Sequence, residues 1–298
     1  MSRSLLSAAC HAYAIAGVAY LIYLARLRGR SAAVGALALA AGLGLHGAVI
    51  VLRYREMVVT PVSSLADGLS FMAWLLVAAY LLLDRIYELP VLGAFVTPLA
   101  LTITVSALLV PSAPPGAMRA LLGMPGLVAH VCVAFAGMAL FALAGGAALL
   151  YLVLERQMKG KRFGFAFSRL PSLEILDDLN RKLVVGGFAL LSITIASGAL
   201  FAKARWGSYL DMWDPKDALS LLAWVIFGGL IAARLAAGWR GTRVAVLTML
   251  GLTVLMTSWV GLFAFPAGRH AAMQDGDAPV PSQRAPDPSA KAEGPAHG

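Results

Sequence analysis

The feature of this sequence that most limits its fold is the regular return of apolar runs about 20 residues long, separated by short polar connections. A run of that length matches the span that an α-helix needs to cross a bilayer. Backbone groups in lipid must satisfy their own hydrogen bonds, so such runs form helices. We therefore predict an all-α, polytopic membrane helix bundle. Its eight transmembrane helices are expected over residues 5–25, 32–52, 65–84, 90–110, 122–154, 183–203, 218–238 and 243–265.

The composition excludes several other classes of protein. Hydrophobic residues make up 60% of the chain and charged residues only 13%, too few charges for a water-exposed globular surface. The net charge of +9 does not indicate nucleic-acid binding, because Lys and Arg lie singly or in small groups between apolar runs. Cys10 and Cys132 lie far apart inside apolar runs, and the chain contains neither CxxC nor CxxCH. Thiol–disulfide chemistry and a covalent c-type haem of its own are therefore not expected.

The distribution of Lys and Arg predicts the orientation in the membrane. Fourteen of them lie in the first, third, fifth and seventh connections, whereas seven lie at the N-terminus and in the other connections. By the positive-inside rule the fourteen mark the cytoplasmic side, so both termini are expected outside, in the periplasm of a bacterial inner membrane. Residues 1–265 then form one integral membrane domain. Residues 266–298, rich in Pro, Ala, Ser and Asp, predict a disordered periplasmic tail.

The cytoplasmic connection over residues 155–182 contains a possible surface helix. Leu173, Ile175, Leu176 and Leu179 can share one side of a short helix, opposite acidic residues. This pattern predicts a helix lying on the cytoplasmic face of the membrane.

The sixth connection, residues 203–217, reads KARWGSYLDMWDPKD and has a good structural interpretation. Asp214 can cap a helix that starts with Pro215 at its first position and Asp217 at its third. Trp206 and Trp213 can be ordinary anchors at the membrane interface.

The same connection also has a functional interpretation. Trp206, Tyr209 and Trp213 lie within eight residues and can form a flat apolar platform on which a porphyrin stacks. A basic side chain nearby can meet the porphyrin propionates. The candidates for that contact are Lys203, Arg205 and Lys216.

Four histidines are expected on the outer side of the membrane. His130 and His46 lie roughly 10 Å below the outer surface, at 1.5 Å of rise per residue. His11 lies in the outer half of the first helix, and His270 follows the last helix. Neutral histidine is a common axial ligand of haem iron, and polar groups within a bilayer are costly unless they serve a purpose. In the alternative interpretation each of these histidines simply hydrogen-bonds a neighbouring helix, and His297 lies in the tail.

The pattern W-G-S-Y-x-x-x-W-D-P-K-D, from Trp206 to Asp217, resembles the tryptophan-rich haem-handling loop of the cytochrome c assembly family, which includes CcsA, CcmC and CcmF. Further stretches, among them SFMAWLLVAAYLLLDRIYELP, HVCVAFAGMALFALAGG and PSLEILDDLNRK, are similar to parts of CcsA-like proteins. Together the similar stretches cover about residues 65–265.

The resemblance implies a non-covalent haem b site at the periplasmic face. In the family, two exposed histidines flank the loop and ligate haem; His130 matches the first and His270, in A-G-R-H, the second. His46 resembles a histidine of shorter CcsA-like proteins of the YpjD type, and is a further candidate. The loop residues implied in the site are Trp206, Gly207, Tyr209, Trp213, Asp214 and Lys216.

The function implied is a component of c-type cytochrome biogenesis that holds haem and presents it to apocytochrome c, as part of a haem lyase complex with a second membrane subunit. Three departures from the family keep a second hypothesis open, that of a structural or regulatory partner without haem. The loop is one residue longer than is usual in the family. Leu210 stands where the family usually has another Trp, and Ala232–Ala233–Arg234 stands where CcsA proteins carry a histidine. A solute permease ranks last, because the helix centres hold no carboxylates and no broken helix pair.

Overall fold

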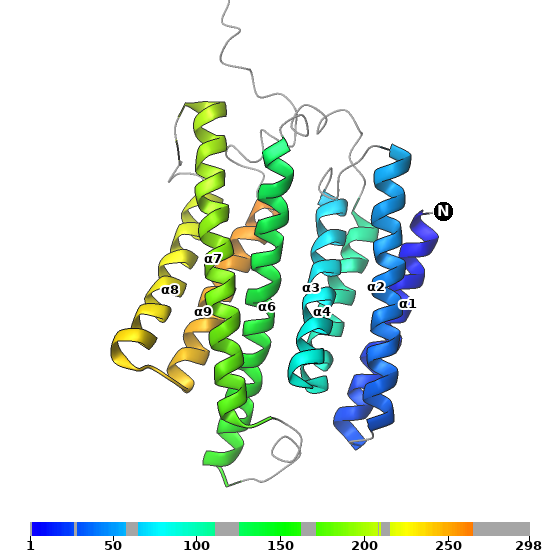
Figure 1. The fold of residues 1–298 in the computed structure, drawn as a ribbon, viewed down its shortest axis with the longest axis vertical. Helices are drawn as coiled ribbons and strands as arrows, with labels where there is room; N and C mark the ends of the chain where they lie inside the picture. The colour runs from blue at the N-terminus through cyan, green and yellow to red at the C-terminus, as the bar shows by residue number, and fades with distance from the viewer. Residues whose placement is uncertain are drawn as a thin grey trace, which may run out of the picture.

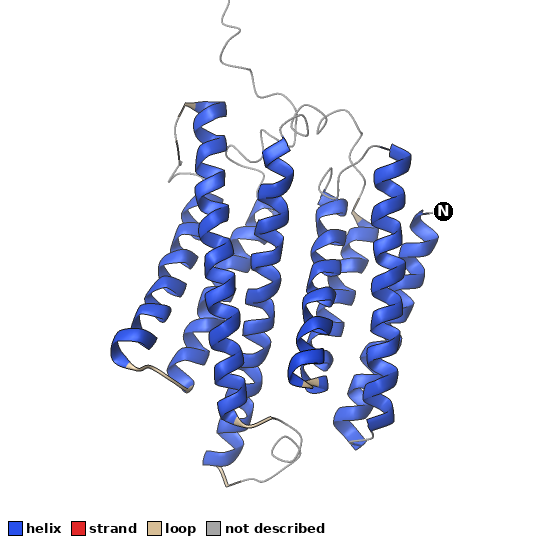
Figure 2. Ribbon diagram, viewed as in Figure 1, coloured by secondary structure: helices blue, strands red, loops and turns tan. Residues whose placement is uncertain are grey.

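The computed structural model describes residues 2–26, 29–57, 65–110, 125–161, 171–207, 209 and 215–264. All regular secondary structure in these ranges is helical (Figure 2). The helices are α1 (Ser2–Arg26), α2 (Gly29–Met57), α3 (Leu65–Tyr87), α4 (Pro90–Leu109), α6 (Pro125–Lys159), α7 (Leu173–Trp206), α8 (Pro215–Ala237) and α9 (Thr242–Ala264). The predicted all-α helix bundle is confirmed.

Seven helices in the described ranges are long and apolar enough to cross a membrane. The eighth, α9, contributes a shorter apolar stretch, Thr242–Ser258. The chain is thus a multi-pass membrane protein, as the apolar runs predicted. The side on which the termini lie stays a prediction.

Successive helices run in opposite directions (Figure 1). We call the end with the start of α1, the start of α6 and the connection from α7 to α8 the upper end, as drawn in Figure 1, and the opposite end the lower end. At the lower end only Glu88 and Leu89 separate α3 from α4, and Pro90 starts α4 without needing a hydrogen-bond partner for its nitrogen. The described residues of the connections predicted to be cytoplasmic lie at the lower end (Figure 1).

Helix α7 differs from the prediction. It begins at Leu173, where the Ser172 hydroxyl accepts a hydrogen bond of 3.3 Å from the Ile175 amide, and runs uninterrupted to Trp206. The expected surface helix is therefore the first two turns of α7. Leu176 and Leu179 are buried in the protein and do not lie on a lipid surface, and no Gly or Pro separates them from the apolar run that follows.

Helix α6 is the central helix of the bundle. It contacts α3 and α4 on one side and α7 and α9 on the other. Phe141 of α6 also stacks on Phe227 of α8, with ring centroids 3.9 Å apart. Helix α6 therefore connects the group formed by α1 to α4 with the group formed by α7 to α9 (Figure 1).

Polar contacts join the lower ends of α6, α7, α8 and α9. Arg234 of α8 donates to Asp177 of α7 at 2.5 Å, and the Gly241 amide donates to the same carboxylate at 3.4 Å. Glu155 of α6 accepts a hydrogen bond of 2.5 Å from Thr242 of α9. These contacts fix the lower end of this group of helices.

Candidate functional site

His130 lies at the upper end of α6, in its second turn, and is half-buried. Its Nδ1 lies 2.8 Å from the Ser197 hydroxyl of α7, and its ring meets the Phe201 ring edge-on at 5.8 Å between centroids. A Cβ at Gly198 would lie 3.1 Å from His130 Cε1, so glycine at this position lets the imidazole lie close to α7. Three residues of α7 thus hold the His130 ring in place.

The Ser197 contact favours one tautomer of the neutral ring. The Ser197 hydroxyl lies 2.7 Å from the Ile193 carbonyl of its own helix, to which it can donate its one proton. The hydroxyl then accepts from His130 Nδ1–H, and the neutral imidazole carries its lone pair on Nε2. Histidine ligands of metals are commonly oriented in this way by a hydrogen bond to the other nitrogen. The donor chemistry of His130 therefore fits an axial ligand of haem iron.

Lys203, in the last turn of α7, contacts the two described residues that follow this helix, Gly207 and Tyr209. Helix α7 ends in a left-handed cap at Gly207, whose φ of 77° favours glycine. Lys203 Nζ donates to the Gly207 carbonyl at 2.9 Å and lies 5.1 Å from the centroid of the Tyr209 ring. Tyr209 itself is 56% exposed. The Tyr209 ring thus follows the end of α7, with the Lys203 ammonium over one of its faces and more than half of its surface exposed.

The far end of the loop begins α8. Pro215 is the first residue of α8 and Asp217 lies in its first turn, as the sequence predicted. Trp213 and Asp214 lie outside the described residues, and nothing is described of the Trp206 and Lys216 side chains. The described parts of the loop and His130 lie at the same upper end of the bundle (Figure 1).

The other histidines are placed separately. His46 of α2 is fully buried, with partners on α1 and α3, and not on α6 or α7. His11 is exposed on α1, with its Nδ1 2.7 Å from the Ser7 carbonyl. His270 and His297 lie outside the described residues. The contacts of the described residues thus centre the candidate site on His130.

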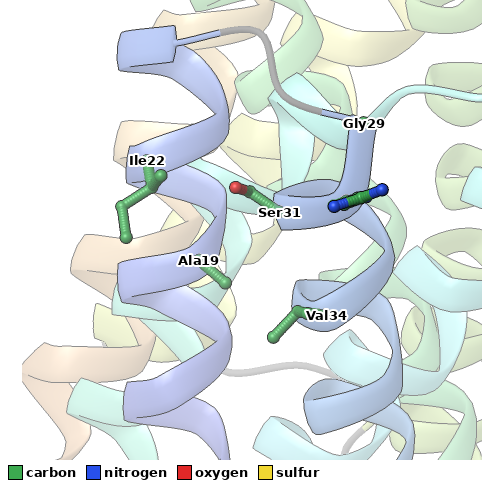
Figure 3. A pocket seen from close by; sticks show the side chains of 6 residues that line it. Ala19, Ile22, Gly29, Ser31 and Val34 are labelled. Atoms are coloured by element: carbon green, nitrogen blue, oxygen red, sulfur yellow. The ribbon is translucent and has the colours of Figure 1, made fainter.

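Two further features bear on the location of a site. Within the described ranges, no three side chains of His, Cys, Asp or Glu gather where they could hold a metal ion. A pocket between the lower ends of α1 and α2 contains no imidazole (Figure 3). Its lining residues are Ala19, Ile22, Gly29, Arg30, Ser31 and Val34.

Sequence reasoning missed Ser197 and Gly198 as neighbours of His130. The available signal was a hydroxyl and a glycine side by side near the upper end of an apolar run. Such residues often serve contacts between helices, but their partner helix cannot be read from one sequence.

The family model described as "Cytochrome C assembly protein" matches residues 62–265, which cover α3 to α9. The chain belongs to the cytochrome c assembly protein family. Membership supports a role in cytochrome c biogenesis, and the match begins after α1 and α2. The resemblance stated from the tryptophan-rich loop is confirmed at the level of the family.

Two curated relatives illustrate the similarity. The cytochrome c biogenesis protein CcsA of Synechococcus sp. (strain CC9902) is 31% identical over 250 residues, covering 75% of this chain and 81% of the relative. CcsA of Guillardia theta is 31% identical over 239 residues, covering 74% and 78%. Family members of the CcsA type thus match this chain over most of both lengths.

A solved structure, that of the cytochrome c heme lyase CcmF, shares the fold. Its TM-score is 0.65 over 93% of this chain, at 13% sequence identity. The chain spans about half the length of CcmF, since 50% of that chain is covered. At this identity the likeness concerns the helix arrangement alone.

Proposed function

We propose that this protein binds haem b non-covalently at the upper end of the bundle and presents it to apocytochrome c, together with a second membrane subunit. His130 and His270 are the proposed axial ligands. Trp206, Gly207, Tyr209, Trp213, Asp214 and Lys216 are the proposed platform and its edge. In this proposal the upper end faces the periplasm of a bacterial inner membrane.

The observation that carries the proposal is the geometry of His130. Its ring is held by Ser197, Gly198 and Phe201 and is only half-buried, so a planar ligand can approach from the upper end. Family membership supports the same reading. His46 is a weaker candidate, because both its ring nitrogens are already hydrogen-bonded inside the bundle.

The residues of the site would act by holding haem in one orientation. His130 would hold the haem through its imidazole, the exposed Tyr209 ring would support the porphyrin, and Lys203, whose Nζ lies 5.1 Å from the centroid of that ring, would provide positive charge for a propionate. The thiols of a CxxCH segment then meet the haem vinyl groups. Each thiol adds across a vinyl double bond: sulfur bonds one carbon and the thiol proton goes to the other. Orientation is the catalytic contribution expected of these residues.

The test is the absorption of the detergent-purified protein with added haemin. Wild type should develop a Soret band, and His130→Gly should weaken or shift it, with recovery when free imidazole is added. His11→Ala is the matched control, because His11 is exposed on α1 and bonds only its own helix backbone among the described contacts. A wild type without a Soret band, or an unchanged His130→Gly spectrum, rejects the proposal.

The alternative, a structural or regulatory partner without haem, is favoured by one observation. At the lower end of α8, Ala232 stands where the resemblance to CcsA proteins implies a histidine. The neighbouring Arg234 is bonded to Asp177 of α7, so a structural contact lies at this position. Cytochrome c levels separate the two functions. A deletion strain lacking c-type cytochromes, with normal levels in a His130→Ala strain, would favour the structural partner.

A further inference from the structure

We infer that His46 is a positioning residue, which ties α1 and α2 to α3 and thereby holds the upper end of α6, where His130 lies. The tie, by which we mean the hydrogen bonds that join His46 of α2 to α1 and α3, is seen directly in the structure. Its effect on haem rests on the proposed function.

Both nitrogens of His46 are engaged by other helices. Nδ1 lies 3.1 Å from the Tyr13 hydroxyl of α1, and Nε2 lies 2.7 Å from the Ser70 hydroxyl of α3. The side chain is fully buried, with 0% of its surface exposed. A buried polar group that loses its partner is destabilising, more so where no water reaches it. His46 therefore joins three helices and cannot ligate iron without breaking one of these bonds.

His46 is the middle of three polar contacts between α2 and α3. On the side of the upper end, Arg53 forms an ion pair with Asp67. Toward the lower end, Trp74 Nε1 donates to the Leu43 carbonyl at 3.1 Å. We call these three contacts the α2–α3 seam. The residues that α2 contributes are spaced so that they share one face of that helix, and the same holds for the residues of α3. The three contacts together therefore fix the register of the two helices.

Aromatic packing connects the seam to α6. Phe71 follows Ser70 and stacks on Trp74, with centroids 6.1 Å apart and planes at 12°. Phe71 also meets Phe135 of α6 edge-on, with ring centroids 6.3 Å apart. Phe135 also packs close to α3, since a Cβ at Gly68 would lie 3.2 Å from its ring.

The last step leads from Phe135 to His130. The two residues are five positions apart on α6, roughly 7.5 Å along the helix axis. A helix transmits a tilt or shift over such a distance, since its backbone is rigid. Loosening the α2–α3 seam should therefore let the upper end of α6 move against α7 and displace the His130 ring from its place beside Ser197.

The test compares four variants that remove parts of the tie. Ser70→Ala and Tyr13→Phe each remove one partner of His46, and His46→Gln keeps an amide in its place should His46→Ala fail to fold. We expect unfolding midpoints lower by about 5 °C and haemin loading reduced several-fold. The Soret maximum of the haem that still binds should stay at the wild-type position, and free imidazole should not restore loading.

A distance measurement keeps the tie testable without haem. Spin labels on Arg55→Cys of α2 and Ala129→Cys of α6, both exposed, with the native cysteines replaced, should show a broader distance distribution in Ser70→Ala than in wild type. An unchanged distribution together with an unchanged midpoint overturns the tie. A shifted Soret maximum in His46→Gln, reversed by imidazole, overturns the positioning role by making His46 a ligand. A wild type that binds no haem rejects the proposed function and leaves the distance result to decide the tie.

Discussion

Replacing Ser197 by alanine is the most direct probe of the candidate site without touching a proposed ligand. Ser197→Ala removes the oxygen 2.8 Å from His130 Nδ1 and leaves the ring with its packing against Phe201. The imidazole then loses the bond that favours the tautomer with its lone pair on Nε2. Among the described residues, the Ser197 hydroxyl bonds His130 of α6 and two carbonyls of its own helix, and it bonds no further helix. The global fold should therefore be little affected.

The magnitude follows from the kind of bond. A hydrogen bond between neutral groups contributes about 1 kcal/mol, and removing the hydrogen-bond partner of a metal-ligating histidine typically weakens metal binding by about 10-fold to 100-fold. His130 is half-buried, so water can replace part of the lost bond. We therefore expect the lower figure, a dissociation constant for haemin about tenfold higher, which corresponds to ~1.4 kcal/mol.

The assay is a haemin titration followed at the Soret band, with the unfolding midpoint measured in parallel. Thr194→Val is the matched control: Thr194 lies one turn earlier on α7, is half-buried, and its hydroxyl bonds only the Leu190 carbonyl of its own helix, at 2.8 Å. The reasoning is refuted if Ser197→Ala binds haemin as tightly as wild type. It is equally refuted if Thr194→Val weakens binding by the same factor.

Three further predictions concern stability and topology. Arg234→Met should lower the free energy of unfolding by about 2–3 kcal/mol, because Asp177 keeps a charge without its cation; adding Asp177→Asn should restore most of the loss in denaturation assays. Tyr80→Phe should leave stability unchanged or raise it by about 1 kcal/mol, because its buried hydroxyl has no hydrogen-bond partner among the described residues; a clear loss would contradict this. An impermeant maleimide added to whole cells should label Lys203→Cys and not Glu88→Cys, with native cysteines removed; the reverse pattern would invert the predicted orientation.

The elements of this fold could be predicted because each apolar run has to satisfy its own backbone in lipid, which leaves a helix as the solution. The start of α8 could also be predicted, because a proline at the first helical position is a local signal that needs no knowledge of the packing, and α8 does begin at Pro215. The merged start of α7 could not be predicted, since burial of Leu176 depends on which helices pack against it. The hydrogen-bond partners of His130 and His46 could not be predicted for the same reason. Ser197 and Ser70 look alike in the sequence, and only the helix packing decides which histidine each one meets.

Within α6–α9, the group that contains His130, the placement of polar contacts suggests how a rigid end is combined with an accessible one. At the lower end, charged groups bond across α6–α9, with Asp177 accepting from two different segments. At the upper end, α8 and α9 are joined by a hydrogen bond between the neutral side chains of Ser220 and Ser258, at 3.2 Å. Ion pairs that are partly buried resist opening more than neutral hydroxyl contacts do. Movement that admits a ligand beside His130 should therefore occur at the upper end, so variants at the lower end should alter stability while leaving the haemin dissociation constant unchanged.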